Sequence, residues 1–217
     1  MITLDSWLLD KILILPAILM GLTVHEFAHA YAADRLGDKT PKFQGRLSLN
    51  PFIHLDPIGF LMIILVGFGW AKPVQTNPGA YRNFYKDDLK VSLAGPLSNL
   101  LVAFLAAVAT GVLLRTGILD MTVAENMSSV IISMLSAVIS INCMLFVFNL
   151  IPLPGMDGFH VLRDLFPSVF DRVSDTLYRY QFLILMVFVA TPLSTYMVGA
   201  PSRLLYYSFV RLVNIIF

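Results

Sequence analysis

Hydrophobic residues run through this chain in long uncharged stretches that are separated by polar segments. A helix needs roughly 20 apolar residues to cross a hydrocarbon core of about 30 Å, and four of the stretches come close to or exceed that length. They lie at about residues 7–33, 91–114, 127–153 and 181–202. The pattern predicts an all-α polytopic membrane protein in which these stretches are transmembrane helices, the first one retained and not cleaved.

Two shorter apolar segments extend the predicted number of membrane helices from four to six. Residues 57–71 form a run of 15 uncharged residues that includes three glycines, which is too short to cross comfortably. We expect this run to be re-entrant, or short and tilted. Residues 204–217 carry Arg211 and are either a short fifth span or an interfacial helix.

Polar and apolar residues alternate over residues 45–50, between the first predicted span and the short apolar run. Alternation of this kind is typical of a strand with one buried face. The segment therefore predicts an edge strand within a small β-hairpin or re-entrant region after the first helix. Such an edge could receive an extended peptide.

Composition supports a single membrane-embedded domain over residues 1–217. Hydrophobic residues make up 57% of the chain and charged residues 13%, whereas soluble domains carry about 25% charge. The net charge of +1 argues against a nucleic-acid partner and leaves the lipid bilayer as the expected surroundings. One cysteine, Cys143, excludes an intrachain disulfide.

Basic residues predict the orientation of the spans. Eight of the fifteen Lys and Arg residues lie between Arg35 and Lys90, and three more lie between residues 155 and 180. The loop at residues 116–126 has none. By the positive-inside rule, the two basic stretches face the cytoplasm and the N-terminus faces out.

The sequence His25-Glu26-Phe27-Ala28-His29 closes the first apolar stretch. On a helix, this spacing places the two imidazoles on one face, where both can bind one Zn²⁺, and the glutamate can act as general base on water at that metal. Residues 12–24 would rise about 20 Å, so His25 would lie roughly two-thirds of the way across the hydrocarbon core. Ionisable residues at that depth are costly and indicate function.

A catalytic zinc site needs a third protein ligand. The longer motif with a third histidine six residues on is excluded because that position is Arg35, and Glu125 lies on the opposite face in the predicted orientation. Asp157 lies on the correct side, after a run with two prolines and a glycine that breaks the third span. We therefore predict Asp157 as the third ligand; the alternative is a cap or turn aspartate before Gly158.

The zinc motif and the run at residues 149–158 resemble the site-2 protease family of intramembrane zinc metalloproteases. Other stretches are similar to compact prokaryotic members that lack a PDZ insertion, and the resemblance extends to about residue 165. These stretches are residues 45–51 with His54, Asp56 and Pro57, residues 69–74, and residues 94–99.

The resemblance implies a three-helix metalloprotease core with one Zn²⁺ per chain on His25, His29 and Asp157. It also implies that Glu26 activates water and that Asn149 binds substrate or stabilises the oxyanion. Expected substrates are single-span membrane proteins or membrane peptide remnants, cut within or near the bilayer. The expected location is a prokaryotic cytoplasmic membrane, with the active site toward the cytoplasm.

Three further polar residues are candidates for contacts with the ligands or the substrate: His54, Asn142 and His160. Each also has a structural interpretation. His54 suits a loop or a supporting position better than a ligand. The same holds for His160, although its spacing of three residues from Asp157 could place the two on one face. An intramembrane Asn such as Asn142 often only bridges helices.

Two other functions compete with proteolysis: a membrane metal-ion transporter, and a zinc-binding membrane protein without protease activity. Transport is disfavoured because strong ligands occur only in the first span and at the end of the third. A pure binding site has no use for the general base Glu26.

Overall fold

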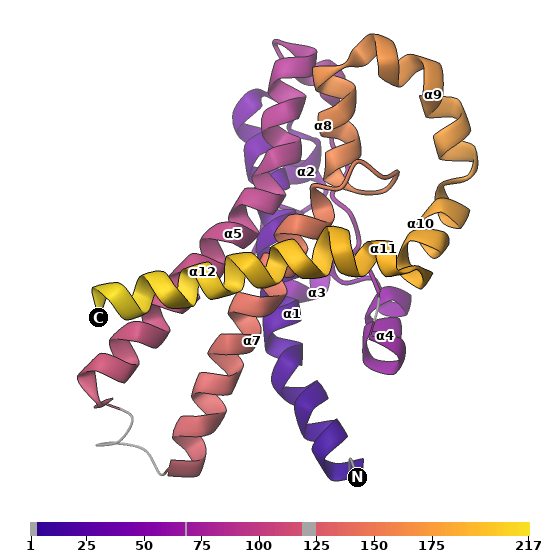
Figure 1. Cartoon of the computed structure of the whole chain (residues 1–217). Helices are drawn as coiled ribbons and strands as arrows, with labels where there is room; N and C mark the ends of the chain where they lie inside the picture. The colour runs from indigo at the N-terminus through magenta and orange to yellow at the C-terminus, as the bar shows by residue number, and fades with distance from the viewer. Residues whose placement is uncertain (1–3, 68, 119–124) are drawn as a thin grey trace.

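The computed structural model describes residues 4–67, 69–118 and 125–217, and this part of the chain is mostly helical (Figure 1). Its long helices are α1 (Leu4–Leu36), α5 (Phe84–Thr116) and α7 (Glu125–Asn149). Shorter elements are α2 (Thr40–Phe43), α3 (Pro51–His54), α4 (Pro57–Val66), η1 (Pro78–Ala80), α8 (Asp157–Leu165), α9 (Pro167–Arg179), α10 (Gln181–Ala190), α11 (Pro192–Ser194), η2 (Thr195–Gly199) and α12 (Ala200–Ile216).

Helices α1, α5 and α7 pack together at the centre of the molecule and spread apart toward their lower ends in Figure 1. Their apolar parts, Leu13–Leu36, Phe84–Thr116 and Met127–Asn149, are long enough to cross a membrane. Ala17, Ala103 and Ala107 are buried where the helices meet. Small residues allow membrane helices to approach closely, so the predicted three-helix core is confirmed as a packing unit.

The predicted fourth span at residues 181–202 is not one continuous helix. Helix α10 ends at Ala190, and Thr191 is extended before Pro192. Proline lacks a backbone N–H and disfavours helical geometry in the residue before it, which explains the break. Helices α9 and α10 meet at 80°, so the described residues hold three helices able to cross a membrane, or up to four if that bent pair is one span.

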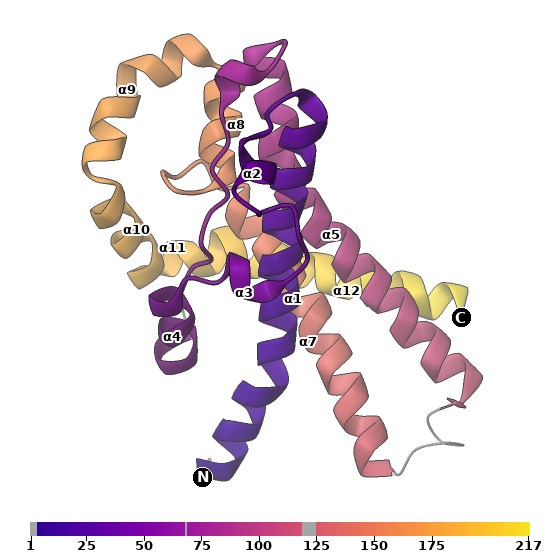
Figure 2. The same ribbon diagram turned by 180° about the vertical axis from the view of Figure 1, so that it is seen from behind.

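The final helix, α12, packs across α5 and α7 and does not follow their direction (Figure 2). Val213 is buried against Gly111 of α5. Helix α12 therefore packs on the outside of the three-helix core. Whether residues 57–71 and 204–217 enter the bilayer stays a prediction.

The predicted strand at residues 45–50 is wrong. Within the described residues no strand occurs, and the β-type pairing there is one isolated antiparallel bridge between Leu55 and Ala71. Local contacts use the polar groups of this segment instead: the Asn50 side chain caps α3, and the Ser48 carbonyl binds His54. Short-range side-chain bonds of this kind compete with a sheet ladder.

Between the bridge partners the chain runs out along α4 and returns. Helix α4 has ten residues and is about 15 Å long. It ends at Val66, and Gly67 after it caps the helix in the left-handed conformation. The extended chain at residues 69–77, called here the return segment, passes close to α4. A Cβ on Gly59 would stand 2.2 Å from the Trp70 carbonyl oxygen. This hairpin of helix and extended chain places residues 72–77 of the return segment beside α1.

Candidate metal centre

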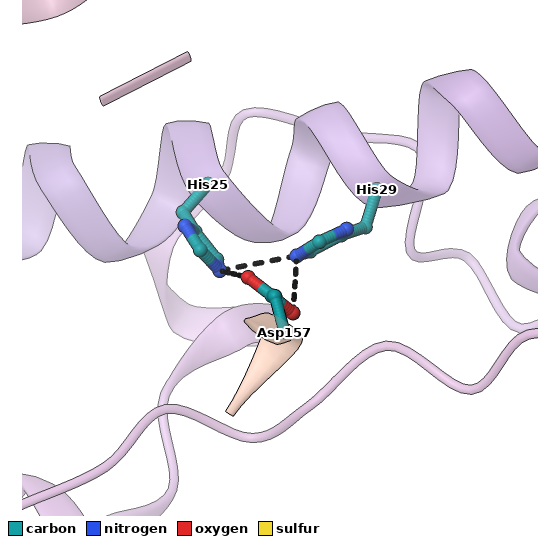
Figure 3. Close-up of side chains that lie close together, drawn as sticks. All are labelled: His25, His29 and Asp157. Atoms are coloured by element: carbon teal, nitrogen blue, oxygen red, sulfur yellow. Dashed lines mark hydrogen bonds and ion pairs between the residues drawn. The ribbon is translucent and has the colours of Figure 1, made fainter. Parts of the chain in front are cut away.

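Two turns of α1 and the first residue of α8 bring three ligand side chains together (Figure 3). The Nε2 atoms of His25 and His29 are 3.1 Å apart. Asp157 places Oδ2 3.1 Å from His25 Nε2 and Oδ1 3.2 Å from His29 Nε2. Among the described residues, these three form the group whose ligand atoms all lie within 4.8 Å of one another.

Hydrogen bonds on the far side of each imidazole fix its tautomer. His29 Nδ1 lies 2.7 Å from the Val91 carbonyl oxygen, and His25 Nδ1 lies 2.7 Å from Asn99 Oδ1. The Val91 carbonyl oxygen can only accept. The atom of Asn99 that faces His25 is also an acceptor, because the amide nitrogen of Asn99 donates to the Gly21 carbonyl oxygen and to Asn142. Each neutral histidine therefore carries its proton on Nδ1 and turns the lone pair of Nε2 toward the other histidine and Asp157.

This arrangement fits a bound cation. Two nitrogen lone pairs and a carboxylate face one another at about 3 Å in a buried place, which is repulsive unless a positive charge lies between them. Two imidazole nitrogens and one carboxylate are the ligand types of a catalytic zinc site with an open fourth position.

Gly95 of α5 makes room for the ligands. A Cβ at this position would stand 2.3 Å from His29 Nε2 and 2.7 Å from His25 Cε1. No side chain fits at such distances, so α5 can approach the two imidazoles this closely only with glycine here. The same helix supplies Val91 one turn before and Asn99 one turn after, so one face of α5 supports the metal site.

Glu26 is buried beside the ligands, 8% exposed. Its Oε2 accepts a hydrogen bond of 2.8 Å from the backbone N–H of Val74, in the extended segment after α4. The carboxylate is therefore held in place by a segment 48 residues away in sequence. This leaves Oε1 for a second hydrogen-bonding partner.

Helix α8 positions Asp157 at its first residue. Arg163, two turns later on α8, forms an ion pair with Asp88 of α5 and bonds the carboxylate of its neighbour Asp164 at 2.9 Å. A Cβ on Gly158 would meet the Leu150 carbonyl oxygen at 2.3 Å, so α8 also packs tightly on the chain that follows α7. The third ligand is thus fixed by contacts with α5 and with the end of α7.

The other candidates from the sequence lie in different surroundings. Asn149 is the last residue of α7, half-buried, and its amide donates to the Leu145 carbonyl oxygen at 3.0 Å. Asn142 is fully buried and links Asn99 to the Val138 carbonyl oxygen at 2.9 Å. Its position supports the helix-bridging interpretation as well as a link to the ligand His25.

The two remaining histidines are not part of the ligand group. His54 is fully buried at the end of α3, with Nε2 2.7 Å from the Ser48 carbonyl oxygen. His160 lies half-buried on α8, where burial and the nearby Arg163 lower its pKa. A neutral imidazole is therefore expected at His160 at neutral pH.

Sequence reasoning did not assign roles to Asn99, Gly95, the Val91 carbonyl or the Val74 N–H. A signal for Asn99 was present, because a polar side chain inside an apolar span is costly unless it is hydrogen-bonded. The backbone groups carry no sequence signal, and only the packing of α5 and the return segment against α1 reveals them.

The fold and the site together define a membrane-embedded metal-dependent hydrolase: an HExxH helix with a buried glutamate and an Asp from a later helix, beside an apolar three-helix core. Residues 13–190 match the family model described as peptidase family M50. The chain therefore belongs to peptidase family M50.

Relatives in bacteria carry the same type of description. The chain is 39% identical over 179 residues to the putative zinc metalloprotease YwhC of Bacillus subtilis, covering 82% of this chain and 80% of that protein. It is 31% identical over 191 residues to the putative zinc metalloprotease Rip2 of Mycolicibacterium smegmatis, covering 83% and 68%. Rip2 of Mycobacterium tuberculosis is 27% identical over 186 residues, with the same coverage. No solved structure matches the chain.

Proposed function

We propose that this protein is an intramembrane zinc endopeptidase in which His25, His29 and Asp157 bind the metal and Glu26 is the general base. The observation that carries this assignment is the convergence of three ligand atoms within 4.8 Å, beside a buried glutamate. Membership of peptidase family M50 supports the reaction class.

Bound Zn²⁺ would supply Lewis acidity, which activates water near neutral pH and polarises a peptide carbonyl. Glu26 would take the proton of the attacking water on Oε1 and return it to the leaving amine. The Val74 N–H holds the other carboxylate oxygen, so the base stays aimed in one direction. Asn99 and the Val91 carbonyl keep the two imidazoles in the binding tautomer throughout.

Asn149 is proposed to bind the substrate or to stabilise the oxyanion. It ends α7 eight residues before the ligand Asp157, and its bond to the Leu145 carbonyl occupies one of the two amide hydrogens. The second hydrogen can then donate to a substrate carbonyl. A preorganised donor of this kind typically contributes 10²–10³ in kcat.

The proposed substrates are transmembrane segments of single-span proteins, or peptide remnants in the bilayer. Two of the ligands lie on a helix whose apolar part, Leu13–Leu36, is long enough to span a membrane, so the site is reached from within or near the bilayer. By the positive-inside rule, the basic residues between Arg35 and Lys90 favour the cytoplasmic side for this end of α1. We therefore propose a cytoplasmic membrane location with the site toward the cytoplasm.

Glu26→Gln tests the proposal, with Asp175→Asn as the matched control that removes a carboxylate from an exposed position. Each variant is expressed in cells that lack the protein, and membrane proteomes are compared with wild type. We expect single-span proteins or membrane peptides to accumulate with Glu26→Gln alone, while the purified variant keeps its zinc. Identical proteomes with zinc retained would contradict proteolysis and favour transport or zinc binding.

A further inference from the structure

Arg46 is a buried cation that binds backbone carbonyls, and it forms no ion pair with a carboxylate of the described residues. It lies in the loop between α2 and α3 and is 5% exposed. One terminal nitrogen of its guanidinium donates to the Ile53 carbonyl oxygen and the other to the Lys72 carbonyl oxygen. Burial of a charge is costly, and a planar guanidinium that reaches two carbonyls at once is suited to fixing geometry.

The two carbonyls belong to the segments that enter and leave the α4 hairpin. The Lys72 N–H donates to the His54 carbonyl oxygen at 2.8 Å, and Leu55 pairs with Ala71 in the isolated antiparallel bridge. Arg46 thus crosses from one segment to the other beside the bridge. A single bridge with no sheet around it has few bonds of its own, so this contact is a large share of what keeps the two segments together.

Val74, two residues after Lys72 in the return segment, binds the proposed general base Glu26. The Val74 N–H lies 2.8 Å from Glu26 Oε2. At the other end, the Asn77 N–H donates to the buried carboxylate of Asp38 at 2.6 Å. Residues 72–77 are therefore anchored at both ends, by Arg46 and by Asp38, and the middle of the segment holds the Glu26 carboxylate.

We propose that Arg46 is a positioning residue for the general base. By holding the Lys72 and Ile53 carbonyls, it fixes the return segment so that the Val74 N–H keeps the Glu26 carboxylate oriented toward the metal site. This inference rests on the proposed role of Glu26 as base. Arg46 contacts neither the ligands nor the reacting atoms, so its loss changes the orientation of Glu26 and leaves the metal in place.

The first test measures the return segment directly. Arg46→Gln and Arg46→Lys are compared with Arg172→Gln, which removes an exposed arginine. Hydrogen–deuterium exchange of peptides that cover residues 71–77 reports the Val74 N–H, zinc analysis reports the metal, and cleavage of a transmembrane peptide gives kcat and KM. A lysine has one charged nitrogen and cannot reproduce the two-carbonyl contact, so both Arg46 variants should behave alike.

We expect faster exchange in residues 71–77 and a kcat roughly 10-fold to 100-fold lower, because small misplacements of a catalytic group have effects of this size. Zinc content and KM should stay near wild type. Unchanged exchange over residues 71–77 would overturn the proposal, and so would loss of zinc in both variants, because Arg46 would then support the ligands and not the base.

A rescue experiment separates positioning from a direct effect of the charge. Leu55→Cys and Ala71→Cys are introduced into Arg46→Gln, with the single native cysteine removed by Cys143→Ser. The Lys72 to His54 bond makes Leu55 and Ala71 a pair without hydrogen bonds of their own, the kind whose side chains lie closest. Oxidation would then join the two segments without restoring a cation.

If Arg46 positions the segment, the oxidised form of this quadruple variant should regain slow exchange and most of the lost kcat, while the reduced form should not. Recovery of slow exchange without recovery of kcat would overturn the positioning role and assign the effect to the charge. The exchange measurement does not need cleavage. If wild type itself cleaved nothing, the proposed function would fail, and the exchange data would still decide whether Arg46 holds the Val74 N–H in place.

Discussion

The Oδ1 atom of Asn99 lies 2.7 Å from Nδ1 of His25, although 74 residues separate them. Asn99 in turn binds the Gly21 carbonyl and Asn142, so one buried amide joins α1, α5 and α7 at the level of the metal site. This link makes the tautomer of His25, a proposed metal ligand, depend on the packing of all three long helices. Correct assembly of the core and readiness to bind metal are therefore coupled.

Replacing Asn99 by leucine should weaken zinc binding by roughly 10-fold to 100-fold, the usual effect of removing the hydrogen-bond partner of a metal-bound histidine. Competition with a calibrated chelator measures the affinity. Asn214→Leu makes the same replacement at an exposed position and should leave the affinity unchanged. Equal affinities for all three proteins would show that Asn99 does not orient His25.

Gly95→Ala should abolish zinc binding while the protein remains helical, because the added methyl would lie 2.3 Å from His29 Nε2. Metal analysis after purification, with circular dichroism as the fold check, measures this. Gly199→Ala is the matched control, since Gly199 has helical backbone angles and a Cβ there meets its nearest neighbour at 3.8 Å. A zinc-loaded Gly95→Ala protein would contradict the observed approach of α5.

Asn149→Ala should lower kcat by about 10²–10³ and leave zinc content unchanged, if its amide stabilises the oxyanion. Steady-state cleavage of a transmembrane peptide in detergent or lipid separates kcat from KM. An increase in KM alone would assign Asn149 to substrate binding. Unchanged kinetics would show that Asn149 only caps the end of α7 through the Leu145 carbonyl.

The stability of the protein should depend on pH through the buried Asp164 of α8. Burial is the main cause that raises the pKa of Asp164 to about 6, the bond from Arg163 acts against it, and the neighbouring Asp88 adds to the rise. The folded-state pKa of Asp164 lies above its unfolded-state value, so the protonated carboxyl favours the folded protein. This contribution to the free energy of unfolding is complete below about pH 4 and is lost as pH rises through 6.

Asp164→Asn should therefore stabilise the protein at pH 7 by roughly 1–3 kcal/mol and have little effect at pH 4 to 5, where Asp164 is protonated. Thermal unfolding across this range, with Asp175→Asn as an exposed control, measures the difference. A stability gain of equal size at all pH values would show that the carboxyl does not titrate near 6.

Periodicity and length predicted the long helices well, because a helix that crosses a membrane must be apolar along nearly all of its length. The same criterion failed at residues 181–202. That stretch is apolar enough, but Pro192 prevents a continuous helix, and the direction of α12 is set by packing on α5 and α7. The alternation at residues 45–50 also misled, since Arg46 turns inward to bind backbone and the expected strand does not form.

The sequence by itself determined how His25, Glu26 and His29, the proposed ligands and general base, lie relative to one another, because their spacing on one helix fixes this relation without any other contact. It also pointed to Asp157 through the broken chain before it. Only the tertiary structure decided what supports these groups: the Asn99 amide, the Val91 carbonyl, the space left by Gly95 and the Val74 N–H. These contacts join segments about 50 to 75 residues apart, and three of the four depend on backbone or on an absent side chain, which no residue pattern records.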